Sequence, residues 1–127
     1  MILDHIRDLV EFEKFFNEHP LGAELYTFDF IKDNPNLFCF YDEENGNLDG
    51  YIVITADKND RLYLSGAARR KNMRENINAI KMVCDAFPCD IYSETDKKPA
   101  KLVLLKAGFK KLHNNLYRRI RYGKIST

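Results

Sequence analysis

The turn-forming run Glu44-Asn45-Gly46-Asn47 limits the folds open to this chain more than any other stretch of its sequence. Asn and Gly accept the positive φ angles that tight hairpin turns need, and β-prone residues flank the run on both sides. We therefore expect a hairpin with strands at Leu37–Tyr41 and Tyr51–Thr55. Lys58-Asn59-Asp60 predicts a second turn, after which Leu62–Leu64 begins a third antiparallel strand.

Helical periodicity lies on both sides of these strands. Apolar residues recur at helical spacing from Leu3 to Phe16, and this helix ends before Pro20. Residues 21–33 are consistent with a second helix, whose apolar face would hold Leu25, Phe28 and Ile31. After the third strand, the pattern predicts a helix over residues 71–86, which Pro88 ends.

The last third of the chain returns to short elements. Ile91 and Tyr92 predict a short strand, Pro99 opens a further helix, and Gly108 is suited to its C-terminal cap. Asn114-Asn115 predicts a turn between two final strands, the second running over residues 116–122.

This order of elements predicts an α/β (α+β) fold with a mixed, mostly antiparallel sheet flanked by helices. The strand–helix–strand unit supplies one parallel pair, because such crossovers normally return parallel to the first strand. A length of 127 residues suits a single domain over residues 1–127.

Two stretches resemble the GNAT superfamily of N-acetyltransferases. One is the hairpin over residues 37–54, whose second strand opens with Gly50, and the other is the helix over residues 100–109, which ends in Gly108-Phe109. The resemblance spans about residues 37–122, and the first GNAT strand has no clear counterpart. It implies a GNAT-like fold, acetyl-CoA as cofactor and a small amine as substrate.

The stretch Arg61–Lys71 resembles GNAT-like internal virion proteins of short-tailed phages, which carry a similar Leu-Ser-Gly and basic segment. This second resemblance implies a protein partner from the virion or the host, and a location in the virion or the host cytoplasm. Since no apolar run is long enough to cross a bilayer, and the N-terminus does not read as a signal peptide, we expect a cytoplasmic protein with no membrane contact.

The GNAT resemblance places the loop that holds the cofactor's pyrophosphate at residues 69–75. In the family, glycine lets the backbone N–H groups approach the phosphates. Here Met73 and Glu75 stand where glycine or alanine is expected. The side chains that would bind an anion instead are Arg69, Arg70, Lys71, Asn72 and Arg74. The alternative is a solvated basic turn, or a contact for another protein or nucleic acid.

The resemblance also locates the catalytic groups. Many GNAT enzymes place a tyrosine acid four residues before the Gly of Gly-Phe, where this chain has Leu104, which cannot donate a proton. Tyr92, Glu94 and Tyr117 are the candidate substitutes, with Glu94 as a base toward the amine. The alternative reading of Glu94 is a surface carboxylate at a strand end.

Charge is distributed unevenly along the chain. Residues 1–50 hold twelve acids and three bases, whereas residues 97–127 hold ten bases and no acid. A basic end is typical of proteins that bind nucleic acid or acidic partners, and the alternative is that the two ends face each other. Tyr117–Tyr122 reads either as a stacking and phosphate surface or as an edge strand guarded by charge.

The three cysteines, Cys39, Cys84 and Cys89, favour a reducing compartment, because their number is odd. Cys84 and Cys89 have no second ligand pair nearby, so we expect free thiols and no metal site.

Three functions remain open from the sequence. The first is a non-catalytic GNAT-like protein with a degenerate acetyl-CoA site and a virion or host-interaction role. The second is a divergent acetyl-CoA-dependent N-acetyltransferase that acts on an amine. The third is a nucleic-acid-binding module that uses the basic C-terminal third. No pattern in the sequence sets an oligomeric state.

Overall fold

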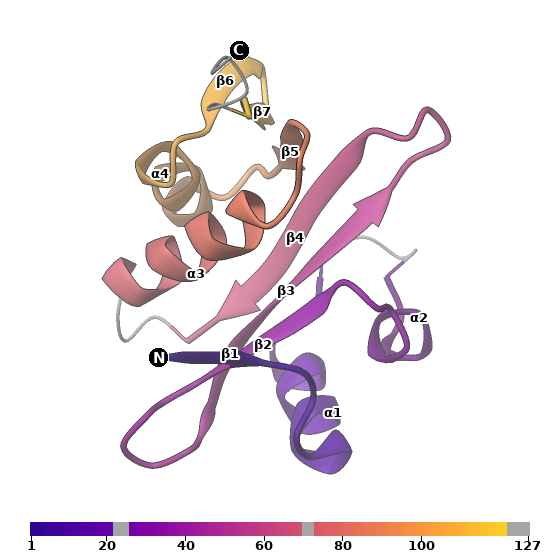
Figure 1. Cartoon of the computed structure of the whole chain (residues 1–127), viewed down its shortest axis with the longest axis vertical. Coiled ribbons are helices and arrows are strands. Elements are labelled where there is room, and N and C mark those ends of the chain that lie inside the picture. Colours follow the sequence, from indigo (N-terminus) through magenta and orange to yellow (C-terminus); the bar gives the residue numbers. More distant parts are fainter. Residues whose placement is uncertain (22–25, 70–72, 122–127) are drawn as a thin grey trace. The chain divides into compact units, whose positions relative to one another are not determined.

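The computed structural model describes residues 1–21, 26–69 and 73–121, and confirms the predicted mixed fold (Figure 1). The strands pair in the order β1-β2-β3-β4-β5-β7-β6, and the pair β4–β5 is parallel. The elements are β1 (Ile2–Asp4), α1 (Leu9–Glu18), α2 (Phe28–Lys32), β2 (Leu37–Tyr41), β3 (Leu48–Ala56), β4 (Leu62–Ala68), α3 (Met73–Asp85), β5 (Ile91–Glu94), α4 (Lys98–Lys106), β6 (Lys110–His113) and β7 (Leu116–Arg119).

The chain forms two compact units, of which the first comprises Met1–Ile54 and Ser65–Asn72. Its core is aromatic: α1 directs Phe12, Phe15 and Phe16 onto the ring of Tyr51 in β3. The helix begins where the Asp8 side chain accepts hydrogen bonds from the backbone N–H groups of residues 10 and 11. This burial of large rings accounts for the apolar periodicity seen in the sequence.

Side-chain packing explains why glycine occupies position 50 of the hairpin. Gly50 pairs with Phe40 across the β2–β3 ladder, and the Phe40 ring lies over it. A Cβ added at Gly50 would lie 2.7 Å from Cε1 and Cε2 of that ring, and closer still to Cζ. Because Phe40 is only 2% exposed, its ring has little room to move away, and the site favours glycine.

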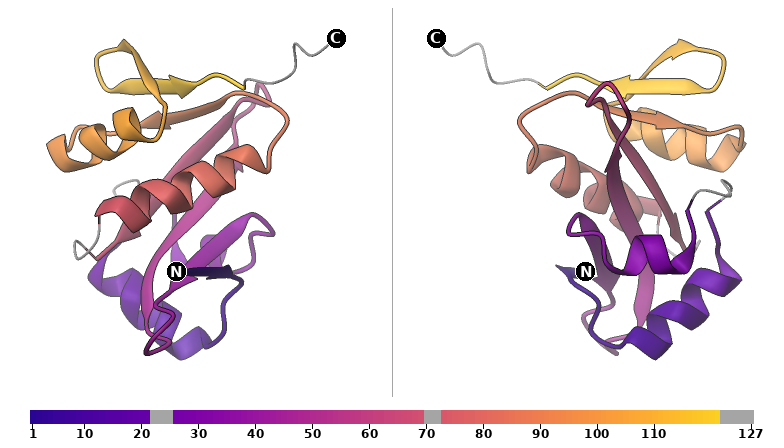
Figure 2. Two further views of the ribbon diagram at one scale, coloured as in Figure 1. Left: turned by 60° about the vertical axis from the view of Figure 1, so that its left-hand side comes forward. Right: turned by 90° about the vertical axis from the view of Figure 1, so that its right-hand side faces the viewer.

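The second unit comprises Thr55–Leu64 and Met73–Thr127. Its helices α3 and α4 lie on the same side of β5, β7 and β6 (Figure 2). Arg119 in β7 contacts the C-terminal ends of both helices. Its Nη1 lies 2.9 Å from a carboxylate oxygen of Asp85, at the end of α3, and its Nε donates to the carbonyl of Ala107, which follows α4, at 3.0 Å. Ile91 and Tyr117, on the same side, are buried.

The structure corrects the sequence reading in three places. The N-terminus contains a strand, β1, that pairs with β2, so the helix expected from Leu3 begins only at Leu9. The strand β7 lies between β5 and β6 and is therefore not an edge strand. Tyr117 is 3% exposed, so its ring is not available for stacking or for donating a proton to a bound substrate, whereas Tyr122, the other tyrosine of the predicted stacking surface, lies outside the described residues.

The predicted helices, the domain organisation and the membrane prediction can also be compared with the structure. The helix predicted over residues 71–86 is confirmed from Met73 to Asp85 as α3, and the Pro99 helix is confirmed as α4. The helix expected within residues 21–33 is the shorter α2, and Leu25, Lys71 and Asn72 lie outside the described residues. The single domain over residues 1–127 stays a prediction. Among the described residues, every helix is too short or too polar to cross a bilayer.

Candidate functional site

Arg69, the first of the predicted anion-binding residues, follows β4 in the first unit and is held against α1. Its backbone N–H donates to the Asp49 carbonyl at 2.9 Å, and its Nε donates to the Leu48 carbonyl at 3.2 Å. The guanidinium carbon lies 5.1 Å from the centroid of the Phe15 ring, within the range of a cation–π contact. Arg69 is thus oriented by three contacts within its own unit.

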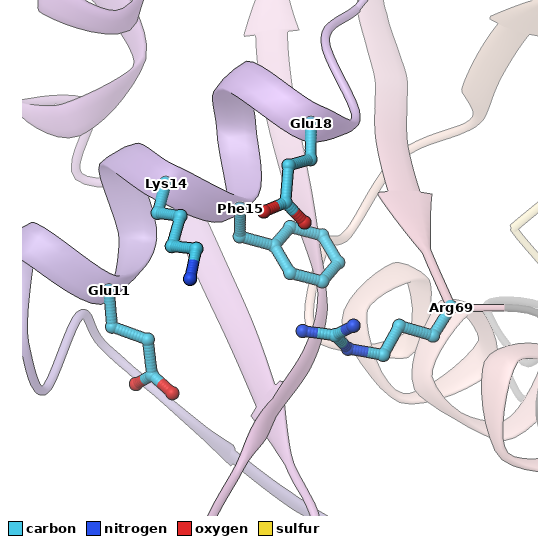
Figure 3. A pocket seen from close by; sticks show the side chains of 5 residues that line it. All are labelled: Glu11, Lys14, Phe15, Glu18 and Arg69. Carbon is cyan, nitrogen blue, oxygen red and sulfur yellow. The ribbon is translucent and has the colours of Figure 1, made fainter.

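Arg69 also lines an open hollow of about 310 Å³ on the surface of α1 (Figure 3). The other lining residues, Glu11, Lys14, Phe15 and Glu18, all come from that helix. The hollow therefore presents two carboxylates together with two cations. Because the carboxylates partly neutralise Arg69 and Lys14, this arrangement is a weak attractor for a further anion such as a diphosphate.

The remaining predicted anion-binding residues are placed as follows. Arg70, Lys71 and Asn72 lie outside the described residues. Arg74 is the second residue of α3, in the second unit, and its side chain is exposed. Their joint role in binding an anion stays a prediction.

The two candidate catalytic residues share β5, where alternation puts Tyr92 and Glu94 on one face and Ile91 and Ser93 on the other. Tyr92 is half-buried: the Arg61 guanidinium lies 4.4 Å above its ring, and the Tyr63 ring lies 5.8 Å away. A hydrogen bond to Tyr63 raises the pKa of the Arg61 guanidinium above its ordinary value. Tyr92 is therefore part of a packed surface cluster with Arg61 and Tyr63.

Glu94 and Ser93 differ strongly in environment. Glu94 is exposed, at the end of β5 opposite Leu116. Ser93 is buried, and its hydroxyl donates to the Leu64 carbonyl at 2.9 Å. In the parallel ladder between β4 and β5, Leu62 pairs with Ile91 and Tyr63 with Tyr92. The hydrogen bond from Ser93 to Leu64 therefore links the two strands one residue beyond this ladder.

Leu104 occupies the position at which the family resemblance expects a tyrosine acid. It lies in α4, is 4% exposed, and its carbonyl accepts a hydrogen bond from the Phe109 N–H at 3.0 Å. Ala107 and Phe109, which follow it in the Gly-Phe segment, are also buried. In this chain the Leu104 side chain is therefore part of the hydrophobic core of the second unit.

The cysteines are free thiols in unlike surroundings. Cys39 and Cys84 are buried, and burial raises the pKa of each thiol to about 12. Cys89 is exposed. Among the described residues, no three His, Cys, Asp or Glu side chains are grouped closely enough to hold a metal ion.

The sequence reading missed Arg61 and Tyr63 as surface-forming residues. The signal was present: in Arg61-Leu62-Tyr63-Leu64, polar and aromatic residues alternate with leucines, and alternation along a strand separates its two faces. What the sequence did not show is that Tyr63 pairs directly with Tyr92.

Solved structures provide the comparison with known proteins. The chain superposes on a GNAT-family acetyltransferase from Bacillus anthracis with a TM-score of 0.64, at 14% identity over 93% of each chain. A putative GNAT-family acetyltransferase from Bordetella pertussis gives 0.60, at 12% identity over 91% of this chain and 93% of that one. A GNAT-family acetyltransferase from Streptococcus pneumoniae gives 0.56, at 15% identity over 92% and 95%.

By sequence, no family model and no curated protein matches the chain. At these identities the superpositions bear on architecture, since one fold hosts many activities. The chain therefore has the fold of the GNAT acetyltransferases.

Proposed function

We propose that this chain is a GNAT-fold protein with a binding role rather than an acyltransferase. The observation that carries the proposal is Leu104, which is buried in the second unit where the family resemblance expects a proton donor. General acid–base groups contribute about 10²–10⁴-fold to an enzyme's rate, so a transferase without one would be slow.

Two of the three candidate substitutes are poorly placed for proton transfer. Tyr92 is engaged by Arg61 and Tyr63, and Tyr117 is buried, which leaves Glu94 as the accessible group on β5. The hollow that Arg69 lines also contains the carboxylates of Glu11 and Glu18, which would repel a diphosphate. These features support a degenerate acetyl-CoA site.

The finer role that we propose is an interaction with a virion or host protein. Its support is the similarity of the Arg61–Lys71 segment to internal virion proteins of short-tailed phages. This role predicts that peptide mass spectrometry detects the chain in purified phage particles. Absence from the particles would overturn the virion role, whereas a host-protein role would still be testable by capture on the purified chain.

A divergent acetyl-CoA-dependent N-acetyltransferase is the second candidate. Its support is the superposition on three acetyltransferases, each over more than nine-tenths of the chain. In this alternative Glu94 would accept the proton of the incoming amine, while Arg69, Arg70, Lys71, Asn72 and Arg74 would hold the cofactor's phosphates. The acceptor would be a small amine.

Release of the coenzyme A thiol separates the two candidates. The purified chain is incubated with acetyl-CoA and a panel of primary amines, and free thiol is followed by absorbance. We expect thiol to appear at the rate seen without protein. Amine-dependent release that is lost in Glu94→Gln but kept in Glu13→Gln, a matched change at an exposed carboxylate of α1, would overturn the binding role.

A further inference from the structure

The sheet register of the second unit brings aromatic and basic side chains into one line. Tyr63 pairs with Tyr92, Tyr92 with Arg118, and Arg118 with Lys110, across the four strands β4, β5, β7 and β6. Cross-strand partners project on the same face of a sheet, so these four side chains lie side by side. We call them, together with Arg61 above the Tyr92 ring, the open-face row.

Within the second unit, this row lies on the face opposite to the helices. Arg119, the neighbour of Arg118, points to the other face, where it binds the ends of α3 and α4. Figure 2 shows both helices on one side of these strands. The exposures agree: Arg61 and Lys110 are exposed, and Tyr63, Tyr92 and Arg118 are half-buried, whereas Ile91 and Tyr117 are buried beneath the helices.

The chemistry of the row matches that of a single-stranded nucleic acid. Aromatic rings and guanidinium planes stack on unpaired bases, and Arg and Lys bind the phosphates between them. The segment that supplies Arg118 and Lys110, residues 97–127, contains ten bases and no acid. Two carboxylates lie near this row. Glu94 is on the same face of β5 as Tyr92, and Asp57 interacts electrostatically with Arg61.

We propose that the open-face row is a binding surface for single-stranded nucleic acid. One base stacks on Tyr63 and the next on the guanidinium plane of the Arg61–Tyr92 pair, while the adjoining phosphates lie along Arg118 and Lys110. A duplex is a poorer fit, because its bases are already stacked on each other and present only their edges. The proposal does not depend on whether the chain binds acetyl-CoA.

The test is fluorescence anisotropy of the whole chain with a labelled oligo-dT of about ten nucleotides, a length within the range that one small domain covers. Tyr92→Leu should weaken binding by about 5- to 150-fold, since it removes the ring that supports the stack. Tyr92→Phe keeps the ring and should bind as the unchanged chain does.

The phosphate contacts are tested by salt dependence. Arg118→Gln and Lys110→Gln should each lower the slope of log affinity against log salt by about one phosphate contact. Lys81→Gln is the matched control, because it removes the same charge from an exposed position on α3. Thermal unfolding by circular dichroism verifies that each variant is folded.

Three results would overturn the proposal. The first is the absence of binding to oligo-dT at low salt. The second is an affinity that Tyr92→Leu and Lys81→Gln change equally. The third is a preference for duplex DNA or for a poly-glutamate peptide over oligo-dT at the same ionic strength, which would assign the row to another class of partner.

Discussion

Replacement of Gly50 by alanine tests the packing on which the hairpin depends. The new methyl group would lie 2.7 Å from two ring carbons of Phe40, well inside van der Waals contact, and the ring is 2% exposed. Overpacking of this kind costs about 1–3 kcal/mol. With a urea dependence of about 1–3 kcal/mol per molar, we expect Gly50→Ala to lower the urea midpoint by about 1 M.

A double-mutant cycle shows whether the Phe40 ring is the cause. Phe40→Leu alone should cost about 1–2 kcal/mol, because it removes part of a buried ring. In the double variant the smaller side chain leaves room for the methyl group. The combined loss should therefore fall short of the sum by about 0.5–3 kcal/mol. Unfolding is followed by far-ultraviolet circular dichroism, and a Gly50→Ala chain of unchanged midpoint, or a strictly additive double variant, would refute the reasoning.

Three further predictions concern the second unit and the thiols. Leu104→Ala should destabilise the chain by about 2–5 kcal/mol in urea denaturation, because the Leu104 side chain is 4% exposed. Leu105→Ala should have little effect, since Leu105 is 50% exposed, and equal losses in the two variants would contradict a core role for Leu104. Arg119→Gln should cost about 1–3 kcal/mol by the same assay, since it breaks the bonds to Asp85 and Ala107, and the matched Arg118→Gln on the other face should be nearly neutral. Iodoacetamide at pH 8 should label Cys89 in the folded chain and spare Cys39 and Cys84, because burial raises the pKa of these two thiols to about 12 and keeps them protonated. Peptide mass spectrometry identifies the labelled cysteines, and rapid labelling of all three would contradict the burial of Cys39 and Cys84.

Much of the fold was predictable because its signals are local. The Asn45-Gly46 turn, the helix ending before Pro88, and the Pro99 to Gly108 segment each depend on the backbone preferences of a few residues. The strand β1 was missed because its three residues, Ile2–Asp4, share apolar periodicity with the helix that follows. The register with β2 decides their conformation, and that contact is remote in sequence.

The site was less predictable, because it depends on which strands meet. The sequence predicts an edge strand over residues 116–122 with Arg on both faces, but β7 ends at Arg119 and lies between β5 and β6. That placement directs Arg119 to the helices and Arg118 to the open-face row. Likewise, the sequence places Tyr63 and Tyr92 far apart, and only the parallel pairing of β4 with β5 joins them.

We propose above that the GNAT fold of this chain carries a binding surface in place of an acyl-transfer site. Amide chemical shifts of the isotope-labelled chain, titrated separately with acetyl-CoA and with oligo-dT, test it most directly. We expect oligo-dT to shift the amides of Tyr63, Tyr92 and Arg118, and acetyl-CoA to leave those of Tyr92–Glu94 and of the first turn of α3 unchanged. Saturable shifts from acetyl-CoA at these positions, with none from oligo-dT, would contradict the account.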